Sequence, residues 1–227
     1  GGDGFWTIPD VDGKTVYAEY QGGNMNRTDL STLKSEFIQP QKTKSEEKLR
    51  WNWNTPIVTG AKNPKNLYTA AQYLYKSTDQ GRTWIRISND LTTNDKKKQK
   101  QEESGGLSAD NTSAENHCTI FTVSESPIDE NLIWAGTDDG NLQYTLNGGK
   151  QWTNVSRNVA SCGIASQAWV SSIQPSHVDR NIVYATFENH MYGDHQTYLG
   201  VSKDMGKTWT RLQSNDFTGF AHKIIED

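Results

Sequence analysis

The chain has 227 residues, a net charge of −4, 33% hydrophobic residues and 10% aromatic residues. With so few apolar residues, large aromatic side chains must supply much of the buried surface. At a net charge of −4 we expect no face basic enough to bind nucleic acid, and no apolar run approaches the roughly 20 residues of a membrane span. We therefore expect neither a nucleic-acid partner nor insertion into a membrane.

A short strand pattern recurs four times along the chain. It consists of Val, Leu or Ile, then an aromatic residue, then a small residue, and it occurs at 16–18, 67–69, 133–135 and 183–185. The repeat length is roughly 50 residues once a polar insert at 94–113 is set aside, which fits four strands per unit in a β-propeller.

This period predicts an all-β fold, namely a β-propeller with four four-stranded blades. The blades are expected at about 1–45, 51–92, 117–157 and 167–214, and residues 219–227 are expected to form the first strand of a fifth blade. Four blades and one strand do not close a ring. The remaining blades are therefore expected from the rest of a longer chain or from another chain.

A second pattern marks the turn between the third and fourth strands of blades two, three and four. Each copy contains Asp or Asn, a Gly turn and a Trp that opens the next strand, at 77–84, 145–152 and 202–209. Asp and Asn bond to their own backbone in turns, and Gly adopts positive φ freely. We predict structural roles for Ser77, Asp79, Gly81, Trp84, Asn147, Gly149, Trp152, Ser202, Asp204, Gly206 and Trp209.

The turn pattern resembles the Asp-box, or BNR repeat, Ser-x-Asp-x-Gly-x-Thr-Trp. The copies at 77–84 and 202–209 match fully, whereas the copy at 145–152 has Thr145, Asn147 and Gln151 in place of Ser, Asp and Thr. Stretches such as 17–24, 51–56, 91–95 and 136–141 are similar to large bacterial BNR proteins described as sortilin-like (VPS10) or glycosyl-hydrolase-like. The resemblance implies an internal segment of a longer protein that is secreted or lies in a bacterial envelope, in the periplasm or at the cell surface.

Ligand binding is predicted on the face that collects the loops entering each first strand. The Asp-box turns lie on the opposite face, because they join third strands to fourth strands. Trp51 and Trp53, with Asn52 and Asn54, offer stacking and hydrogen bonding to a sugar or a peptide; alternatively, one Trp plugs a blade junction and the other faces solvent. The predicted binding residues are Trp51, Asn52, Trp53, Asn54, Asn116, His117, His190, Asp194 and His195.

The carboxylates considered for glycoside hydrolysis are Asp138, Asp139 and Glu115. That chemistry needs two acids about 5–5.5 Å or 6.5–9.5 Å apart. Against it, Asp139-Gly140 is a common hairpin turn, and adjacent residues of a strand point apart. No catalytic residue is therefore assigned.

Two other sets of residues were weighed for special chemistry. Glu188, His190, Asp194 and His195 share one loop, but their spacing matches no tight metal motif, so no metal and no cofactor are assigned. Cys118 and Cys162 allow one disulfide between neighbouring blades or two separate thiols.

These observations favour a non-catalytic, sortilin-like propeller that binds a protein or peptide partner. The alternative is a glycoside hydrolase or polysaccharide-binding propeller that resembles xyloglucan-active BNR enzymes, and in that case a glycan is the partner. If the protein is an enzyme, we expect a glycoside hydrolase.

Overall fold

The structure is a computed structural model, and it describes residues 2–44, 47–100 and 115–227. The described residues contain sixteen strands, which form four antiparallel sheets of four strands each. In every sheet the strands pair in chain order, so each blade is a simple meander.

Blade one comprises β1 (Gly4–Pro9), β2 (Thr15–Tyr20), β3 (Asn24–Asp29) and β4 (Ser35–Phe37); blade two comprises β5 (Ile57–Thr59), β6 (Leu67–Ala70), β7 (Leu74–Ser77) and β8 (Ile85–Arg86). Blade three comprises β9 (Ile120–Glu125), β10 (Ile133–Thr137), β11 (Leu142–Thr145) and β12 (Thr153–Asn154); blade four comprises β13 (Trp169–Pro175), β14 (Val183–Asn189), β15 (Asp194–Ser202) and β16 (Thr210–Arg211).

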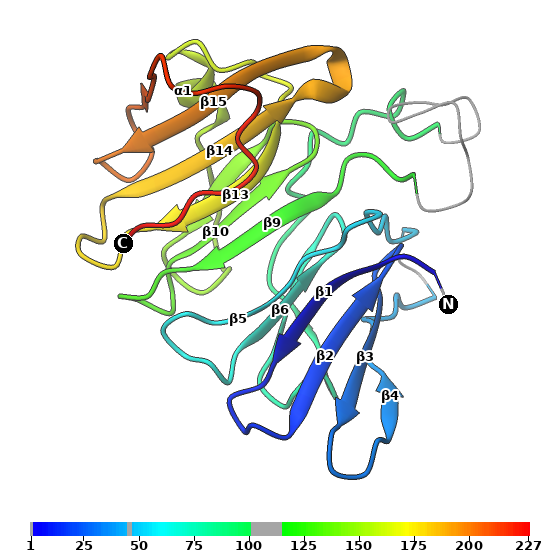
Figure 1. The fold of residues 1–227 in the computed structure, drawn as a ribbon. Helices are drawn as coiled ribbons and strands as arrows, with labels where there is room; N and C mark the ends of the chain where they lie inside the picture. Colours follow the sequence, from blue (N-terminus) through cyan, green and yellow to red (C-terminus); the bar gives the residue numbers. More distant parts are fainter. Residues whose placement is uncertain (1, 45–46, 101–114) are drawn as a thin grey trace.

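The four sheets follow one another around an arc, from blade one in blue to blade four in orange (Figure 1). The first strands lie toward one another across the blades, since β1 contacts β5 and β9 contacts β13. The predicted all-β fold with four propeller blades is confirmed, and its open arc is consistent with part of a larger propeller.

The burial pattern shows which blades are covered on both faces. In β6 and β10 every residue is buried, whereas β2 of blade one alternates buried and half-buried residues. A strand between two packed neighbours buries both faces, and a strand with one free face alternates. Blades two and three therefore lie inside the stack, and blade one presents one uncovered face.

The blades approach closely where Gly136 of β10 faces blade four. A Cβ atom at Gly136 would lie 2.5 Å from the side chain of Val170, so only glycine fits there. Val170 belongs to the largest apolar core, which surrounds the buried Trp134 and joins blades three and four. Similar cores join blade one to blade two and blade two to blade three.

The outer strands of blades two, three and four are short. Their fourth strands, β8, β12 and β16, have two residues each. These strands are sheet edges, where a short ladder leaves fewer unpaired backbone groups open to other chains.

Residues 219–227 form no ladder, although they were predicted to be a strand. They run beside blade four, where Ser171 and Thr186 donate hydrogen bonds to the carbonyl oxygens of Ala221 and His222 at 3.3 and 3.2 Å. An extended segment that has no second strand to pair with cannot form a ladder, even when it packs on a sheet.

The position of this segment matches that of a first strand in the next blade. Glu125, at the end of β9, accepts hydrogen bonds from the Tyr68 hydroxyl at 2.6 Å and from the turn N–H of Asn63 at 2.9 Å, both in blade two. Glu226 likewise accepts a bond from the turn N–H of His177 at 2.7 Å and bonds to Tyr184 of blade four. Glu226 therefore makes the same two contacts with blade four, a turn N–H and a tyrosine, that Glu125 of blade three makes with the preceding blade two.

Helical structure in the described ranges is limited to α1 (Ser156–Ala160) and the 3-10 turn η2 (His190–Tyr192). No helix in these ranges has the length and apolar character needed to cross a membrane.

Candidate functional site

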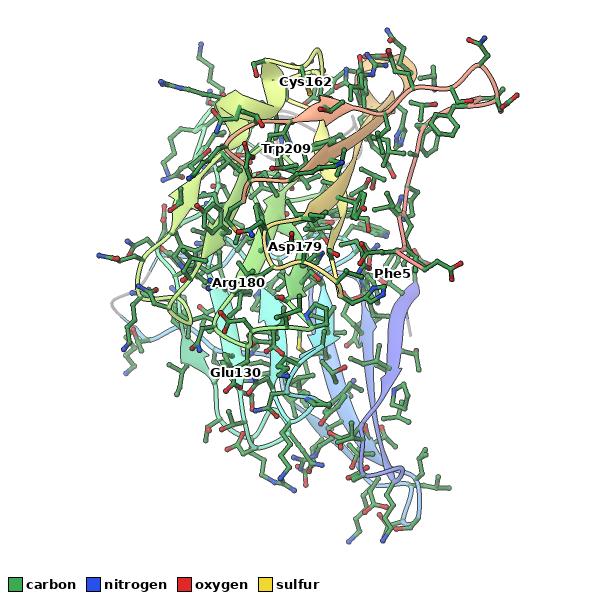
Figure 2. All side chains as sticks on the ribbon, turned by 90° about the vertical axis from the view of Figure 1, so that its left-hand side faces the viewer. Phe5, Glu130, Cys162, Asp179, Arg180 and Trp209 are labelled. Atoms are coloured by element: carbon green, nitrogen blue, oxygen red, sulfur yellow. The ribbon has the colours of Figure 1, made fainter. Side chains whose placement is uncertain are left out.

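The two faces of the propeller segment are distinguished by their turns. Gly148, in the Asp-box turn of blade three, donates a hydrogen bond to Asn131 in the β9–β10 turn at 3.0 Å, so these two kinds of turn share one face. On the same face Arg180 of blade four pairs with Asp129 of blade three at 2.8 Å. Figure 2 looks onto this side and shows Glu130, Asp179 and Arg180 there. The strands β9 and β13 begin on the other face.

A groove of about 390 Å³ opens on that other face, between the loop before blade two and the beginnings of blades three and four. Of the predicted residues, Asn52, Trp53, Asn54 and His190 line it, together with Glu115. The rest of the lining consists of Phe121, Trp169, Glu188 and Met191.

Aromatic side chains form the walls of the groove. The rings of Phe121 and Trp169 meet at an interplanar angle of 66°, with centroids 5.1 Å apart. Trp53 is held on the other side by an edge contact with Phe5, at 6.5 Å and 79°. All three groove rings are half-buried, and Met191 is 43% exposed. The walls therefore combine rigid aromatic surface with one flexible apolar side chain.

Glu188, near the end of β14, is the buried carboxylate of the groove. Only 6% of its side chain is exposed, and its Oε2 lies 3.3 Å from Nδ1 of His190. Its Oε1 contacts Nδ1 of His222, while the ring of His190 stacks on Phe220 at 4.4 Å. A buried carboxylate costs free energy unless it is paired, so these two imidazoles stabilise Glu188 and attach the segment 219–227 to blade four.

Trp51 and Trp53 occupy different environments, and Trp51 lies at a blade junction, as one of the two interpretations of this pair expected. Trp51 is 9% exposed and stacks on Tyr75 at 6.4 Å, inside the core between blades one and two. Gly23 packs against its indole, where a Cβ atom would lie 2.6 Å from the ring. The amide of Asn116 donates to the carbonyl oxygen of Trp51 at 2.8 Å. Trp51 and Asn116 thus support the loop from which Trp53 reaches the groove.

Asp138 and Asp139 were considered as carboxylates for glycoside hydrolysis, and the structure places them inside the protein. They are 0% and 3% exposed. Asp138 accepts bonds from the N–H and hydroxyl of Thr119 at 2.9 and 2.6 Å and from the amide of Asn52 at 3.1 Å. Asp139 accepts bonds from the N–H and hydroxyl of Thr93 at 2.8 and 2.6 Å. The backbone and hydroxyl donors draw both carboxylates inward, away from the groove.

Burial has clear electrostatic consequences at this pair. Desolvation, with the nearby charge of Asp139, raises the pKa of Asp138 well above its usual value. His117 was also predicted on the binding face but is 2% exposed, and its Nε2 lies 3.0 Å from the carbonyl oxygen of Asp138. Burial lowers the pKa of His117. This cluster joins the loops before blades two and three, and Asn52 is its one member among the described residues that line the groove.

Asp194 and His195 lie apart from the groove, at the beginning of β15. Asp194 accepts bonds from the amide of Asn189 at 2.9 Å and the hydroxyl of Tyr198 at 2.7 Å, which lower its pKa. His195 lines a separate hollow of about 650 Å³ along with Arg211. The structure thus separates these two residues from the other predicted binding residues.

The Asp-box turn of blade two is closed by its own side chains. The Oγ of Ser77 accepts a bond from the N–H of Gly81 at 2.8 Å and donates one to Asp79 at 2.7 Å. Asp79 also accepts bonds from the N–H and hydroxyl of Thr83 at 2.9 and 2.6 Å. In blade four, Ser202, Asp204, Gly206 and Thr208 repeat these four bonds.

Blade three keeps the turn with different residues. Asn147 accepts bonds from the N–H of Gln151 and the hydroxyl of Thr145, both at 2.9 Å, and Gly149 donates to Thr145 at 3.0 Å. An amide oxygen thus accepts the same backbone bond as the carboxylate in the other two turns. These contacts lie on the face opposite the groove.

In the described ranges the two cysteines form no disulfide, and the acidic and histidine side chains form no metal centre. No group of three or more His, Cys, Asp or Glu residues is arranged there to hold a metal ion. Cys118 and Cys162 are both free thiols. The Sγ of Cys162 instead donates to Val159 at 3.1 Å, and burial raises the pKa of both thiols, that of Cys118 to about 12.

Two groove residues, Phe121 and Trp169, were not predicted. Phe121 and Trp169 are the second and first residues of β9 and β13, the first strands of blades three and four. An aromatic residue at the beginning of a first strand directly follows a loop of the binding face. This position could have indicated that Phe121 and Trp169 belong to the groove. Glu188 was considered only as a metal ligand.

No family model and no curated protein matches the sequence. Among solved structures, the chain is similar to a GH74 enzyme from Niastella koreensis, with 19% identity and a TM-score of 0.60 over 96% of this chain and 31% of that chain. It is also similar to the GH74 xyloglucanase from Xanthomonas campestris, with 16% identity and a TM-score of 0.56 over 87% of this chain and 28% of that one.

A third similar structure is an extracellular domain from B. thetaiotaomicron that is described as part of a hybrid two-component system. It has 15% identity and a TM-score of 0.52 over 91% of this chain and 21% of that one. The chain therefore spans less than a third of the length of each of these three proteins. At these identities the likeness shows the fold.

Proposed function

We propose that this chain is the non-catalytic binding part of a larger propeller, and that its groove holds a segment of a protein or peptide partner. The observation that carries the proposal is the convergence of Trp53, Phe121 and Trp169 from three separate parts of the chain. Aromatic side chains in partly buried pockets supply much of the affinity in protein recognition.

The placement of the carboxylates favours binding over catalysis. Asp138 and Asp139 are saturated by Thr119, Thr93 and Asn52 inside the protein. Hydrolysis of a glycosidic bond needs two carboxyl groups that face each other across the substrate.

The second candidate is a polysaccharide ligand, and the similarity to GH74 structures supports it. Indole faces such as that of Trp53 stack on sugar rings as well as on apolar side chains. Against it, a groove of about 390 Å³ suits one or two side chains better than a long polymer, since ligand sites run from about 300 to 1,000 Å³.

Two further parts of the proposal concern the whole protein. A sortilin-like role is supported by the resemblance of the Asp-box turns at 77–84 and 202–209. A secreted or envelope location is supported by the likeness to an extracellular domain. We propose that the remaining blades come from the rest of a longer chain or from another chain.

Calorimetry with the protein, a randomised peptide library and xyloglucan oligosaccharides tests the proposal. We expect selected peptides to bind with one-to-one stoichiometry and to lose at least about tenfold in affinity in Trp169→Ala, because a buried aromatic contact contributes more than about 1.4 kcal/mol. His195→Ala, outside the groove, serves as the matched control. Peptide binding that survives both Trp169→Ala and Trp53→Ala would contradict the proposal, and release of reducing sugar would favour the second candidate.

A further inference from the structure

We propose that the groove selects a positively charged side chain, a lysine, an arginine or a methylated lysine, from its partner. This inference rests on the proposed binding function and names the chemistry that the groove recognises. It combines two features of the lining. The aromatic walls meet at an angle, and the described lining residues include carboxylates but no lysine or arginine.

The aromatic walls have the geometry of a corner. Phe121 and Trp169 meet at 66°, and Trp53 lines the groove from a separate loop. A cation over an aromatic face is attracted by the ring quadrupole, with about 0.5–1 kcal/mol at exposed sites and about 2 kcal/mol when water is excluded. Rings in several orientations surround a compact cation, whereas a sugar ring stacks best on one broad face.

Carboxylates outnumber basic side chains in the groove. Glu115 and Glu188 line it together with His190, and neither lysine nor arginine is found among its described lining residues. Lys98 lies near one wall of the groove, with its Nζ 5.9 Å from the centre of the Tyr192 ring. A buried carboxylate next to apolar walls gains most from a cationic ligand, since Coulomb attraction is stronger where water is excluded.

The site is built to keep Glu188 in place. His190 and His222 contact its two oxygens, and Phe220 stacks on His190, so the carboxylate cannot swing out to solvent without breaking these contacts. Its backbone lies in β14 and is paired with Trp169 of β13. A fixed carboxylate at the base of an aromatic corner favours a cation over a neutral group of the same length.

The test uses the peptides Ac-Gly-X-Gly-NH2, where X is lysine, arginine, trimethyl-lysine or norleucine, the neutral analogue of lysine. Binding is followed by the NMR signals of the indole N–H groups, assigned for Trp53 and Trp169. We expect a cationic peptide to bind at least about fivefold more tightly than the norleucine peptide, which corresponds to about 1 kcal/mol.

Matched variants separate the two claims. Glu188→Gln should reduce the preference for charge to less than twofold, and Glu115→Gln provides an independent variant if Glu188→Gln folds poorly. Trp169→Ala should abolish binding of all four peptides, while His195→Ala should change nothing. Equal binding of the lysine and norleucine peptides at the groove would overturn charge selection and leave the binding function standing. No binding of any peptide would overturn charge selection and count against the binding function as well.

Discussion

The indole nitrogen of Trp152 in blade three donates a hydrogen bond to the carbonyl oxygen of Ile87 in blade two, at 3.0 Å. Trp84 of blade two makes the same bond to Ile38 of blade one at 2.6 Å. Both acceptors directly follow the fourth strand of their blade. The Asp-box turn therefore closes its own corner and also attaches each blade to the one before it, whereas Trp209 donates to Gly206 within its own turn.

The contact between Gly149 and Ile87 leads to the first prediction. Both Gly149→Ala and Gly163→Ala place a side chain at positive φ, +100° and +86°, which costs about 1–2 kcal/mol. A Cβ atom at Gly149 would also lie 2.3 Å from the carbonyl oxygen of Ile87, while nothing lies within 4 Å of the one at Gly163. We expect Gly149→Ala to lower the free energy of unfolding by about 1–3 kcal/mol more than Gly163→Ala in urea titrations. Equal losses would contradict the close contact between blades.

The second prediction concerns the carboxylate of Asp79. Asp79→Ala should cost about 2–3 kcal/mol, because it leaves the N–H and hydroxyl of Thr83 and the hydroxyl of Ser77 without their acceptor. Asp79→Asn should cost about 1 kcal/mol, because blade three accepts the same backbone bond with Asn147. Thermal unfolding compares the two variants, and a loss for Asp79→Asn as large as for Asp79→Ala would show that the charge itself is required.

The same residue predicts an acid response. Burial opposes ionisation of Asp79, but hydrogen bonds from Thr83 and Ser77 prevail and lower its pKa to about 2. Because the folded-state pKa lies below the unfolded value of 3.8, the contribution of Asp79 is present above pH 3.8 and lost as the pH falls toward 2. Wild-type protein should therefore lose more stability than Asp79→Asn between about pH 4 and pH 2, the window between the two pKa values. Parallel curves for the two proteins would contradict this assignment.

Glu19 gives the opposite pH dependence. It is 2% exposed, and desolvation raises its pKa to about 8, although the N–H groups of Thr55 and Gly23 bond to it. Between the unfolded value of 4.5 and about 8, the folded state holds a proton that the unfolded state has lost. Stability therefore falls as the pH rises through this window.

Glu19→Gln should remove this dependence. At about pH 5 the variant and wild type should be similarly stable, and at about pH 8.5 the variant should be more stable by about 1–3 kcal/mol, because its neutral side chain is not penalised by burial. Urea midpoints at both pH values measure the difference. A wild-type stability that stays constant from pH 5 to pH 8.5 would contradict the raised pKa.

Asp138→Ala tests the structural role of the buried pair. The change leaves the N–H and the hydroxyl of Thr119 without their acceptor, which should cost about 3 kcal/mol. Arg180→Ala is the matched control, because its pair with Asp129 is partly exposed and should be worth less than about 1 kcal/mol. If the denaturant midpoint of Asp138→Ala equals that of the wild type, the carboxylate does not contribute to stability.

The fold could be predicted from the sequence because its signals are local and repeated. The pattern at 16–18, 67–69, 133–135 and 183–185 marks the second strand of every blade, and tight turns fix which strands are neighbours. The groove could be predicted only in part. Trp51 and Trp53 have the same local pattern, and their separation into core and groove depends on contacts with Tyr75 and Phe5 from other strands.

Burial of Asp138 and Asp139 could not be predicted for a related reason. Asp139-Gly140 has the composition of an exposed hairpin turn, but the donors that bury it come from Thr93 and the loop before blade three. A turn sequence specifies backbone geometry and carries no information on which distant loop will cover it. Sites formed by several loops depend on such long-range contacts.

The most direct test of the central claim, that the groove is the binding site, uses the three methionines of the chain. Met191 lies in the groove and is 43% exposed, whereas Met25 and Met205 are 0% and 8% exposed and act as internal controls. Peroxide oxidation of the full-length protein, with and without a saturating peptide ligand, is read by mass spectrometry. We predict that Met191 oxidises first in the free protein and at least about fivefold more slowly in the complex, as expected for a side chain covered by ligand. An unchanged rate at Met191 under saturating ligand would contradict the account.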